Sequence, residues 1–397
     1  MNVLRPQAIG LLLILLLQTA PLLAQKSQVR VSAWYWLNSA PKVDWQGDFV
    51  TMHNLGFTDV VLAWGIDAAA FATRIEDSRD ALEWAHQAGI GAYLIMWHPS
   101  ANSFERNPKF QFIDSAGKTL RTFDIFNSEW RATQWKEYLQ KVANAYKDEP
   151  ALAGYVFDDS FEVGGNGEVS YGEYELSKFG KELPRRKTDP NWQEWSELRA
   201  RWWEDWARDT TQFIRQADPD GKHEIYIEDT DWQILHSKLA DTVGLDFPRV
   251  ARHFDAVGAY TTAAWDSSPD SGTRAAQYSE KVLHDLREMM GPNTQIIYTF
   301  WVANITEELQ PGAAHFPSAE QIRLVCDAAL RAGIKHIDMY GFRIGDYRVS
   351  SPGEFNQKAP GNGFAYPLTG QFNQKFLWDR PEILDDLGRY LRSLNSR

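Results

Sequence analysis

The sequence predicts a single α/β domain, a (β/α)8 TIM barrel with long loops on the C-terminal rim. Eight short apolar runs alternate with amphipathic stretches of helical period, which is the order of elements in such a barrel. Connections from helix to strand are short, as in QAGIG and RAGIKH, whereas the long segments all follow strands. An open doubly wound sheet is the alternative, but no dinucleotide-binding glycine fingerprint follows the first strand.

The predicted strands are mostly apolar runs without strict alternation, which is typical of strands covered on both faces. They are VRVSAWYW, DVVLAWG, GAYLIMWH, LAGYVFDD, EIYIED, DAVGAYTT, QIIYTFW and HIDMYGF, and they begin near Val29, Asp59, Gly91, Leu152, Glu224, Asp255, Gln295 and His336. Helices such as SRDALEWAHQAG are expected between them. The long segments 98–129, 161–191 and 342–379 follow the third, fourth and eighth strands, so the main pocket is expected on that rim.

Residues 1–24 are predicted to be a secretory signal peptide. A basic residue, Arg5, precedes an apolar run from Ala8 to Leu17, and the small residue Ala24 follows. We expect cleavage after Ala24, a periplasmic or secreted location, and a catalytic barrel over residues 25–397. An uncleaved membrane anchor is the alternative, and no later stretch is apolar enough to cross a bilayer.

Composition restricts the possible partners. The formal net charge of −12 argues against nucleic acid and anionic membrane surfaces. The single cysteine, Cys326, lies in an apolar helical pattern and is predicted to be a core residue. The 17 tryptophans and 15 tyrosines favour a large core or a flat ligand such as a sugar ring. His98 and His336 are isolated and no spacing resembles a metal site, so we predict neither a metal nor another cofactor.

Acidic and aromatic side chains lie where the predicted strands end. Two adjacent aspartates close the fourth strand in GYVFDDSFE, and further acids follow the fifth. We expect three catalytic residues, Asp158, Asp159 and Glu228. The predicted substrate-binding residues are Trp36, Trp64, Trp97, His98, Glu162, Asp229, Trp232, Tyr260, Trp301, Tyr340 and Arg343. Carboxylates ringed by aromatic side chains suit glycoside hydrolysis, because two acids act at the bond while flat rings hold the sugar.

Structural roles remain open for the same residues. Either aspartate of the doublet could cap the next segment or pair with an arginine such as Arg343, and the strand-end tryptophans could pack in the barrel. The tryptophans of NWQEWSELRARWWEDW recur at helical spacing, which favours packing of a helix against the barrel over a binding site.

The barrel with VFDD closing its fourth strand resembles glycoside hydrolases of the chitinase and O-GlcNAc-hydrolase type, which keep an acidic pair there. The resemblance implies hydrolysis of an oligo- or polysaccharide in which the 2-acetamido group of the substrate attacks the anomeric carbon. Asp158 would polarise that group, and Asp159 would act as general acid and then base. The chitinase signature is incomplete, because Tyr155 and Ser160 occupy two of its acidic positions.

Two other hypotheses remain open. A retaining or inverting glycosidase could use one aspartate of the doublet with a carboxylate from a neighbouring strand, namely Glu228, Asp229 or Asp266. A large retaining clan places a glutamate at the end of strand seven, and QIIYTFW ends without an acid. The hypothesis from another class is a secreted barrel that binds glycans without turnover.

Overall fold

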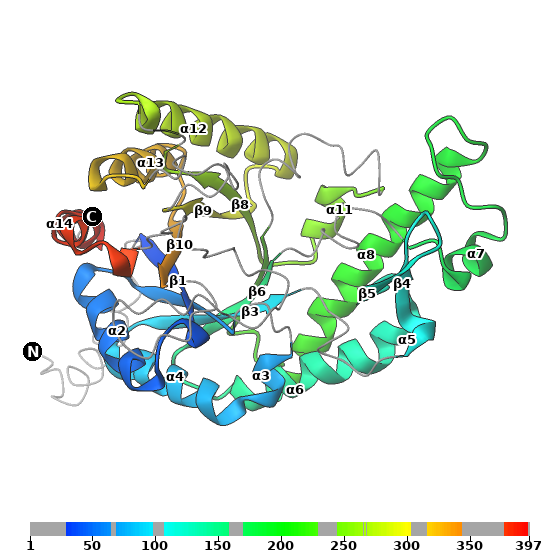
Figure 1. Ribbon diagram of the computed structural model, residues 1–397, viewed down its shortest axis with the longest axis horizontal. Helices are drawn as coiled ribbons and strands as arrows, with labels where there is room; N and C mark the ends of the chain where they lie inside the picture. The colour runs from blue at the N-terminus through cyan, green and yellow to red at the C-terminus, as the bar shows by residue number, and fades with distance from the viewer. Residues whose placement is uncertain are drawn as a thin grey trace, which may run out of the picture.

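The computed structural model describes residues 29–64, 69–97, 107–158, 170–228, 244–264, 266, 268–302, 316–343 and 377–395. Eight parallel strands close into a barrel in the order β1-β10-β9-β8-β7-β6-β3-β2 (Figure 1). The strands are β1 (Arg30–Trp36), β2 (Asp59–Ala63), β3 (Gly91–Trp97), β6 (Leu152–Asp158), β7 (Glu224–Ile227), β8 (Ala256–Thr262), β9 (Gln295–Trp301) and β10 (His336–Arg343). The predicted (β/α)8 barrel is confirmed, and each strand begins at the predicted residue or one residue later.

Helices surround the strands on the outside of the barrel (Figure 1). The longer helices are α2 (Lys42–Leu55), α4 (Ile75–Ala88), α6 (Lys136–Tyr146), α8 (Trp192–Ala217), α12 (Ser271–Met290), α13 (Ala319–Arg331) and α14 (Pro381–Asn395). The shorter ones are α3 (Ala70–Thr73), α5 (Ser128–Trp130), α7 (Glu173–Phe179) and α11 (Phe247–Ala251), with 3-10 turns η2 (Leu37–Ser39), η3 (Pro108–Phe110) and η6 (Leu377–Asp379) and the π-helical turn η4 (Arg131–Trp135). Within the described ranges, no helix is long and apolar enough to cross a membrane.

The last helix packs against the end of the first long one. Helix α2 ends at Gly56, whose φ of 103° is left-handed, and a Cβ there would lie 2.8 Å from the Arg392 backbone nitrogen of α14. Asn395 donates to the Gly56 carbonyl oxygen at 3.0 Å, and Arg392 donates to the Asn54 carbonyl oxygen at 2.6 Å. These contacts hold the C-terminal helix beside α2.

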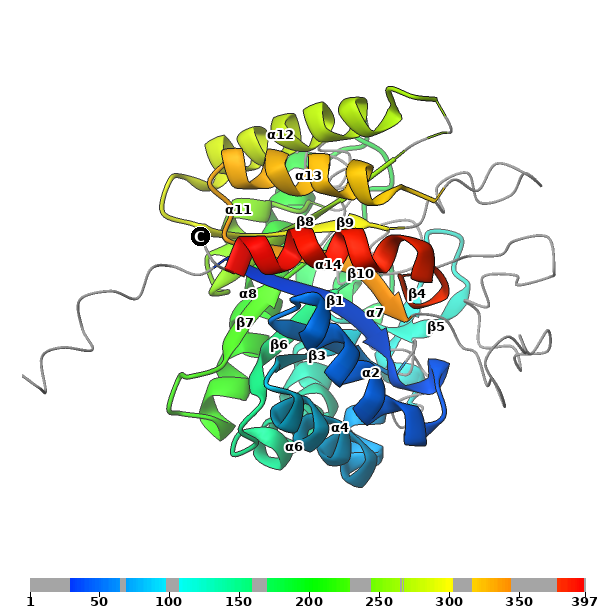
Figure 2. The ribbon, with the colours of Figure 1, turned by 90° about the vertical axis from the view of Figure 1, so that its left-hand side faces the viewer.

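The segment after β3 carries a two-stranded hairpin, β4 (Gln111–Ile113) and β5 (Thr119–Phe123). Figure 2 shows this hairpin on the side of the barrel to which the strand arrows point. The Tyr171 N–H donates to the Ile113 carbonyl oxygen at 2.8 Å, which ties the hairpin to the segment that follows β6. The additional described structure therefore gathers at the C-terminal rim, as predicted.

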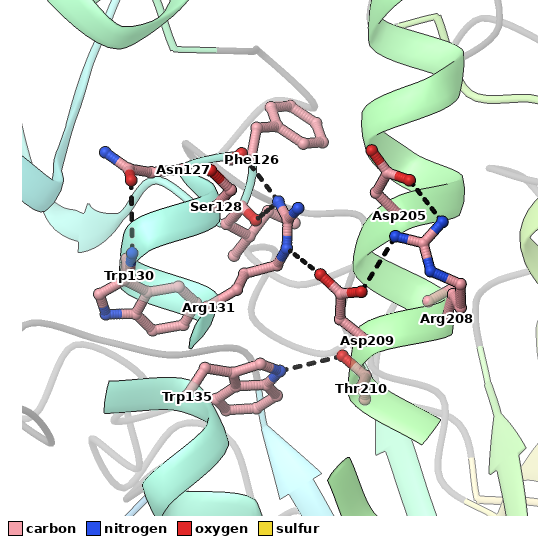
Figure 3. Close-up of polar contacts among 12 residues, drawn as sticks. Phe126, Asn127, Ser128, Trp130, Arg131, Trp135, Asp205, Arg208, Asp209 and Thr210 are labelled. Carbon is pink, nitrogen blue, oxygen red and sulfur yellow. Dashed lines mark hydrogen bonds and ion pairs between the residues drawn. The ribbon is translucent and has the colours of Figure 1, made fainter. Parts of the chain in front are cut away.

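Helices α5 to α6 pack against α8 through a small polar network (Figure 3). Asn127 caps the first turn by accepting from the N–H groups of Glu129 and Trp130. Arg131 donates to Asp209 of α8 at 2.9 Å, and the Trp135 indole donates to Thr210 at 2.9 Å. Four tryptophans of α8, Trp195, Trp202, Trp203 and Trp206, are buried, and Trp192 is partly buried. Trp203 packs on Phe126 and Trp206 on Phe157 of β6, which confirms the predicted packing role of this helix.

Candidate active site

Alternation along the strands decides which side chains enter the barrel. Ser32 pairs with Asp338, Asp338 with Thr299, and Thr299 with Tyr260, across β1, β10, β9 and β8. Side chains in register on neighbouring strands face the same side of a sheet. The hydroxyl of Ser32 donates to Asp338 at 2.6 Å. The Thr299 hydroxyl of β9 donates to Glu228, which follows β7, and a closed barrel brings groups on either side of β8 together on its inner face, so this row of residues faces the interior.

Asp158 reaches the interior at the end of β6. Its neighbour Phe157 packs against Trp135 and Trp206 of the surrounding helices, so alternation turns Asp158 inward. Only 3% of Asp158 is exposed, and one of its carboxylate oxygens accepts a hydrogen bond from the Tyr260 hydroxyl at 3.2 Å. The first aspartate of the doublet therefore faces the barrel interior and not the helices.

Glu228 follows β7 directly and is completely buried. Its backbone N–H donates to the Phe157 carbonyl oxygen at 2.8 Å, which continues the pairing of β6 with β7. Its side chain lies across Gly258 of β8, where a Cβ would be 2.8 Å from Glu228 Cγ. The Thr299 hydroxyl donates to Glu228 Oε1. A glycine in the middle of β8 thus makes room for an acid inside the barrel.

A third interior acid, Asp338 of β10, was not among the predicted site residues. It is completely buried and accepts from Ser32 Oγ at 2.6 Å and from the Trp34 indole N–H at 2.5 Å. Burial raises the pKa of Asp338 to about 6, against the opposing effect of these donors. A charged residue in the middle of a buried strand was the sequence signal that could have identified it.

His336 lies on the inner face of the same strand. Its Nε2 is 3.0 Å from Ser32 Oγ, and burial lowers the pKa of the imidazole to about 3. The hydroxyl proton of Ser32 goes to Asp338, so the serine oxygen accepts from the Nε2–H of a neutral histidine. His336 is therefore a neutral hydrogen-bond donor inside the barrel.

Four aromatic side chains, Trp34, Tyr260, Trp301 and Tyr340, form a cluster at the same end of the barrel, which we call the aromatic cluster. The ring of Tyr340 lies 4.2 Å from that of Trp301 and 4.5 Å from that of Trp34, measured between centroids. Tyr260 lies about 6 Å from the other three rings, at 6.1 to 6.2 Å. Trp301 is the partly exposed member, and flat rings of this kind can stack against sugars.

The structure gives other partners to two predicted substrate-binding residues. The Trp64 indole donates to Ser78 of α4 at 2.9 Å, so this ring packs between β2 and the helices. Arg343 is buried, donates to Asp48 of α2 at 2.6 Å and lies 3.7 Å from the ring centroid of Trp378. These contacts place both side chains outside the barrel wall. They do not support a role in substrate binding, because alternation turns the two residues outward.

Two further predictions have different outcomes. Trp36 is buried and shares the inner side of β1 with Trp34 by alternation, as a site residue would. Asp266, an alternative partner acid, is half exposed and lies beside Ser268 and Arg274, which hold the pKa of its carboxyl well below the usual range. An exposed acid paired with an arginine is a poor proton donor, so the geometry does not support Asp266 as the general acid, and its role as the ionised partner stays a prediction.

Several predicted residues lie outside the described part of the structure, and their roles stay predictions. These are Asp159, Glu162, His98, Asp229 and Trp232, together with the side chain of Trp97.

No protein-family model and no curated protein matches this sequence. Among solved structures, the chain is similar to a β-galactosidase from the psychrophilic Marinomonas ef1, with 15% identity over 79% of this chain and 54% of that one and a TM-score of 0.60. It is also similar to a β-galactosidase from the haloarchaeon Halorubrum lacusprofundi, with 13% identity over 93% and 58% and a TM-score of 0.65. The chain thus spans little more than half the length of these two relatives.

A third similar structure is matched over nearly its whole length. It is the PgaB (BpsB) glycoside hydrolase domain from Bordetella bronchiseptica, with 13% identity over 79% of this chain and 94% of that one and a TM-score of 0.54. At such identities the likeness concerns the fold. The expected resemblance to barrel glycoside hydrolases is confirmed at that level, and no single family is assigned.

Proposed function

We propose that this protein is an exported glycoside hydrolase that cleaves a glycosidic bond in an oligo- or polysaccharide. The observation that carries the proposal is the arrangement of Asp158 and Glu228, two buried acids from neighbouring strands that face the interior beside the aromatic cluster. The fold is shared with a PgaB glycoside hydrolase domain and two β-galactosidases, which supports this class of reaction over others.

The arrangement suits a reaction that uses two carboxyl groups. One of the pair, in its protonated form, gives its proton to the glycosidic oxygen as the bond from that oxygen to the anomeric carbon breaks. The other, ionised, either attacks the anomeric carbon or removes a proton from the water that adds to it. Two neighbouring buried carboxyl groups resist being ionised together, which suits a pair with one protonated and one ionised member.

A substrate-assisted reaction uses the doublet instead. Asp158 would then polarise the 2-acetamido group of the substrate, and Asp159 would transfer the proton. Tyr260 donates to Asp158 in the structure, and this contact would orient the polarising carboxylate. This route restricts the substrates to 2-acetamido sugars, whereas the pair of Asp158 with Glu228 does not.

Three variants separate these routes on any substrate that the wild-type protein cleaves. Asp158→Asn should reduce kcat/KM on the order of 10²-fold or more in both cases, because it removes a charge at the reacting centre. Glu228→Gln should cause a loss of that size only in the two-carboxylate route, and Asp159→Asn only in the substrate-assisted route. In the latter, sugars without a 2-acetamido group should be inert, and an aryl glycoside with a good leaving group should partly rescue Asp159→Asn.

The control variant is Asp48→Asn, which changes a buried acid on the outside of the barrel. The first measurement is product release from a panel of oligosaccharides and aryl glycosides incubated with the mature protein. Oligosaccharide binding without any product would favour the glycan-binding barrel. Full activity in both Asp158→Asn and Glu228→Gln would remove this site from the mechanism.

Export is part of the proposal and rests on the sequence of residues 1–24. The expected mature N-terminus is Gln25. Cell fractionation with N-terminal sequencing tests it, and a protein recovered from the cytosol with Met1 intact would contradict it.

A further inference from the structure

A chain of hydrogen bonds inside the barrel links the candidate catalytic acid Glu228 to the mid-strand acid Asp338. The Thr299 hydroxyl of β9 lies between them: it donates to Glu228 Oε1, and its oxygen is 3.4 Å from Asp338 Oδ2. On the other side of Asp338, the Ser32 hydroxyl donates to Oδ1 and lies against His336. All of these residues are buried.

The other contact of Asp338 leads to the aromatic cluster. The Trp34 indole N–H donates to the carboxylate oxygen that faces Thr299, at 2.5 Å. The Trp34 ring lies 4.5 Å from the ring of Tyr340 and 6.2 Å from that of Tyr260. Oδ2 of Asp338 therefore contacts both Trp34 of the aromatic cluster and the Thr299 hydroxyl that donates to Glu228.

We propose that Asp338 is a positioning residue of the candidate site, which holds the aromatic cluster through Trp34 and controls the charge of Glu228 through Thr299. The inference rests on the proposed function, since it assigns Glu228 a part in the reaction. Asp338 itself lies in the middle of its strand, below the rings, and acts through its neighbours.

Asp338 affects the charge of Glu228 because the two carboxyl groups share a single hydroxyl donor. Thr299 has one hydroxyl proton, so it can donate a full hydrogen bond to Glu228 or to Asp338 but not to both. Two carboxyl groups that share a hydroxyl in a buried interior resist being ionised together, because each negative charge disfavours the other. When Asp338 is ionised, Glu228 is therefore biased toward the protonated form, which is the form that donates a proton.

The groups around Asp338 strengthen this effect. The donors from β1 are the uncharged hydroxyl of Ser32 and the indole of Trp34, and β9 contributes the hydroxyl of Thr299. His336 on the same strand is neutral, because burial lowers the pKa of its imidazole to about 3. From β7, Glu228 and the buried phenol of Tyr226 face the same interior, and burial, followed by the charges of Glu228 and Asp338, raises the pKa of that phenol well above its usual range.

Two variants should move the pH profile of kcat/KM in opposite directions. Asp338→Asn removes a negative charge but keeps the shape, so the ionised form of Glu228 becomes easier to reach. The limb that reports Glu228 should then shift to lower pH by about one unit or more. Thr299→Val removes the donor to the Glu228 carboxylate while keeping the volume, so the same limb should shift to higher pH.

If Asp338 had only a structural role, its replacement would lower activity or stability without shifting either limb of the pH profile of kcat/KM. Asp48→Asn provides the matched control, because Asp48 is a buried acid that accepts from a tyrosine hydroxyl on the outside of the barrel. Its pH profile should superimpose on that of the wild type. If Asp338→Asn does not fold, Thr299→Val still tests the inference. Unshifted limbs, or shifts of the same sign in both variants, would overturn it.

A second measurement does not depend on turnover. Infrared difference spectra recorded during a pH titration report carboxyl protonation, and the Glu228 band is assigned from its loss in Glu228→Gln. We expect this band to titrate at lower pH in Asp338→Asn than in the wild-type protein. An unchanged titration would refute the coupling even if the protein proves to be a glycosidase. A shifted titration in a protein that cleaves no glycoside would keep the coupling and refute the proposed function.

Discussion

Two buried acids on opposite sides of the barrel wall, Asp338 inside and Asp48 outside, have different surroundings. Both accept from a hydroxyl group, Ser32 in the first case and Tyr35 in the second. Burial raises the pKa of both carboxyl groups, but at Asp48 the Arg343 guanidinium opposes the rise. At Asp338 the hydrogen-bond donors are neutral.

The difference shows how one fold uses the same side chain for two purposes. A guanidinium beside a buried carboxylate opposes part of the effect of burial, so the ion pair can fix a strand to a helix. A carboxyl group with neutral donors can gain or lose its proton near the working pH, which suits a site for chemistry. Alternation along each strand separates the two kinds of environment by the thickness of the barrel wall.

The largest expected contrast is between two tryptophans. Trp64 is buried against α4, so Trp64→Ala should lower the free energy of unfolding by about 3–5 kcal/mol with little change in KM. Trp301 is partly exposed in the aromatic cluster, so Trp301→Ala should raise KM with a smaller loss of stability. Urea unfolding and steady-state kinetics measure both. A raised KM in a stable Trp64→Ala protein would restore Trp64 to the binding site.

The outer ion pair should be costly to break from one side. Arg343→Met leaves Asp48 buried without its guanidinium, which should cost about 3–5 kcal/mol. Adding Asp48→Asn to that variant should recover part of the loss, because the uncompensated charge is removed. Urea unfolding of the single and double variants checks this, and additive losses would contradict it.

The contribution of Asp338 to the free energy of unfolding should instead depend on pH. The folded pKa of Asp338 is raised to about 6, so the folded protein holds a proton that the unfolded chain loses from about pH 4 upward. Its contribution to stability is therefore present at low pH and is lost as the pH rises to about 6. The total is on the order of 3 kcal/mol. The difference in unfolding free energy between wild type and Asp338→Asn should change by this amount across that window, and parallel curves would contradict it.

Gly258 provides a smaller and more local test. Gly258→Ala places a Cβ 2.8 Å from Glu228 Cγ, which should cost about 1–3 kcal/mol and reduce kcat/KM by displacing the acid. The control is Gly47→Ala in α2, where a Cβ would meet nothing within 4 Å. That change should stabilise the helix by about 0.5–1 kcal/mol. Unaltered kinetics in Gly258→Ala would show that the position of Glu228 is not critical.

The smallest expected effect lies in the outer layer, at the cap of α5. Asn127→Ala removes the acceptor for two backbone N–H groups and should cost about 1 kcal/mol without affecting kinetics. Asn127→Asp keeps an acceptor and should be close to neutral. Thermal unfolding of the three proteins measures the difference, and equal losses in both variants would argue against capping.

The fold could be predicted because its signal is distributed along the whole chain. Each strand is an apolar run of the right length, and the loop lengths alone indicate which rim is elaborated. The site is harder to predict, because the sequence shows where a strand ends more clearly than it shows the direction of each side chain. Alternation separates Tyr260 and Trp301, which face inward, from Trp64 and Arg343, which face outward, and an error of one residue reverses the assignment.

Asp338 escaped prediction for a related reason. HIDMYGF is mostly apolar, but it contains the charged residue Asp338, which needs hydrogen-bond donors from other strands. Those donors, Ser32, Trp34 and Thr299, are distant in sequence and become neighbours only when the barrel closes. The glycine of DAVGAYTT was a second unused signal, since a glycine in a strand interior often marks the close approach of another group.

The pairing of β1 with β10 also sets a limit on when the chain can fold. Strand β1 can pair with β10 only after both have been made, so closure of the barrel joins segments that lie far apart in the sequence. Until then β1 has an unpaired edge, which other extended chains can join. A nascent chain on the ribosome therefore lacks its last strand for most of synthesis, and its barrel stays open to chaperones during that time.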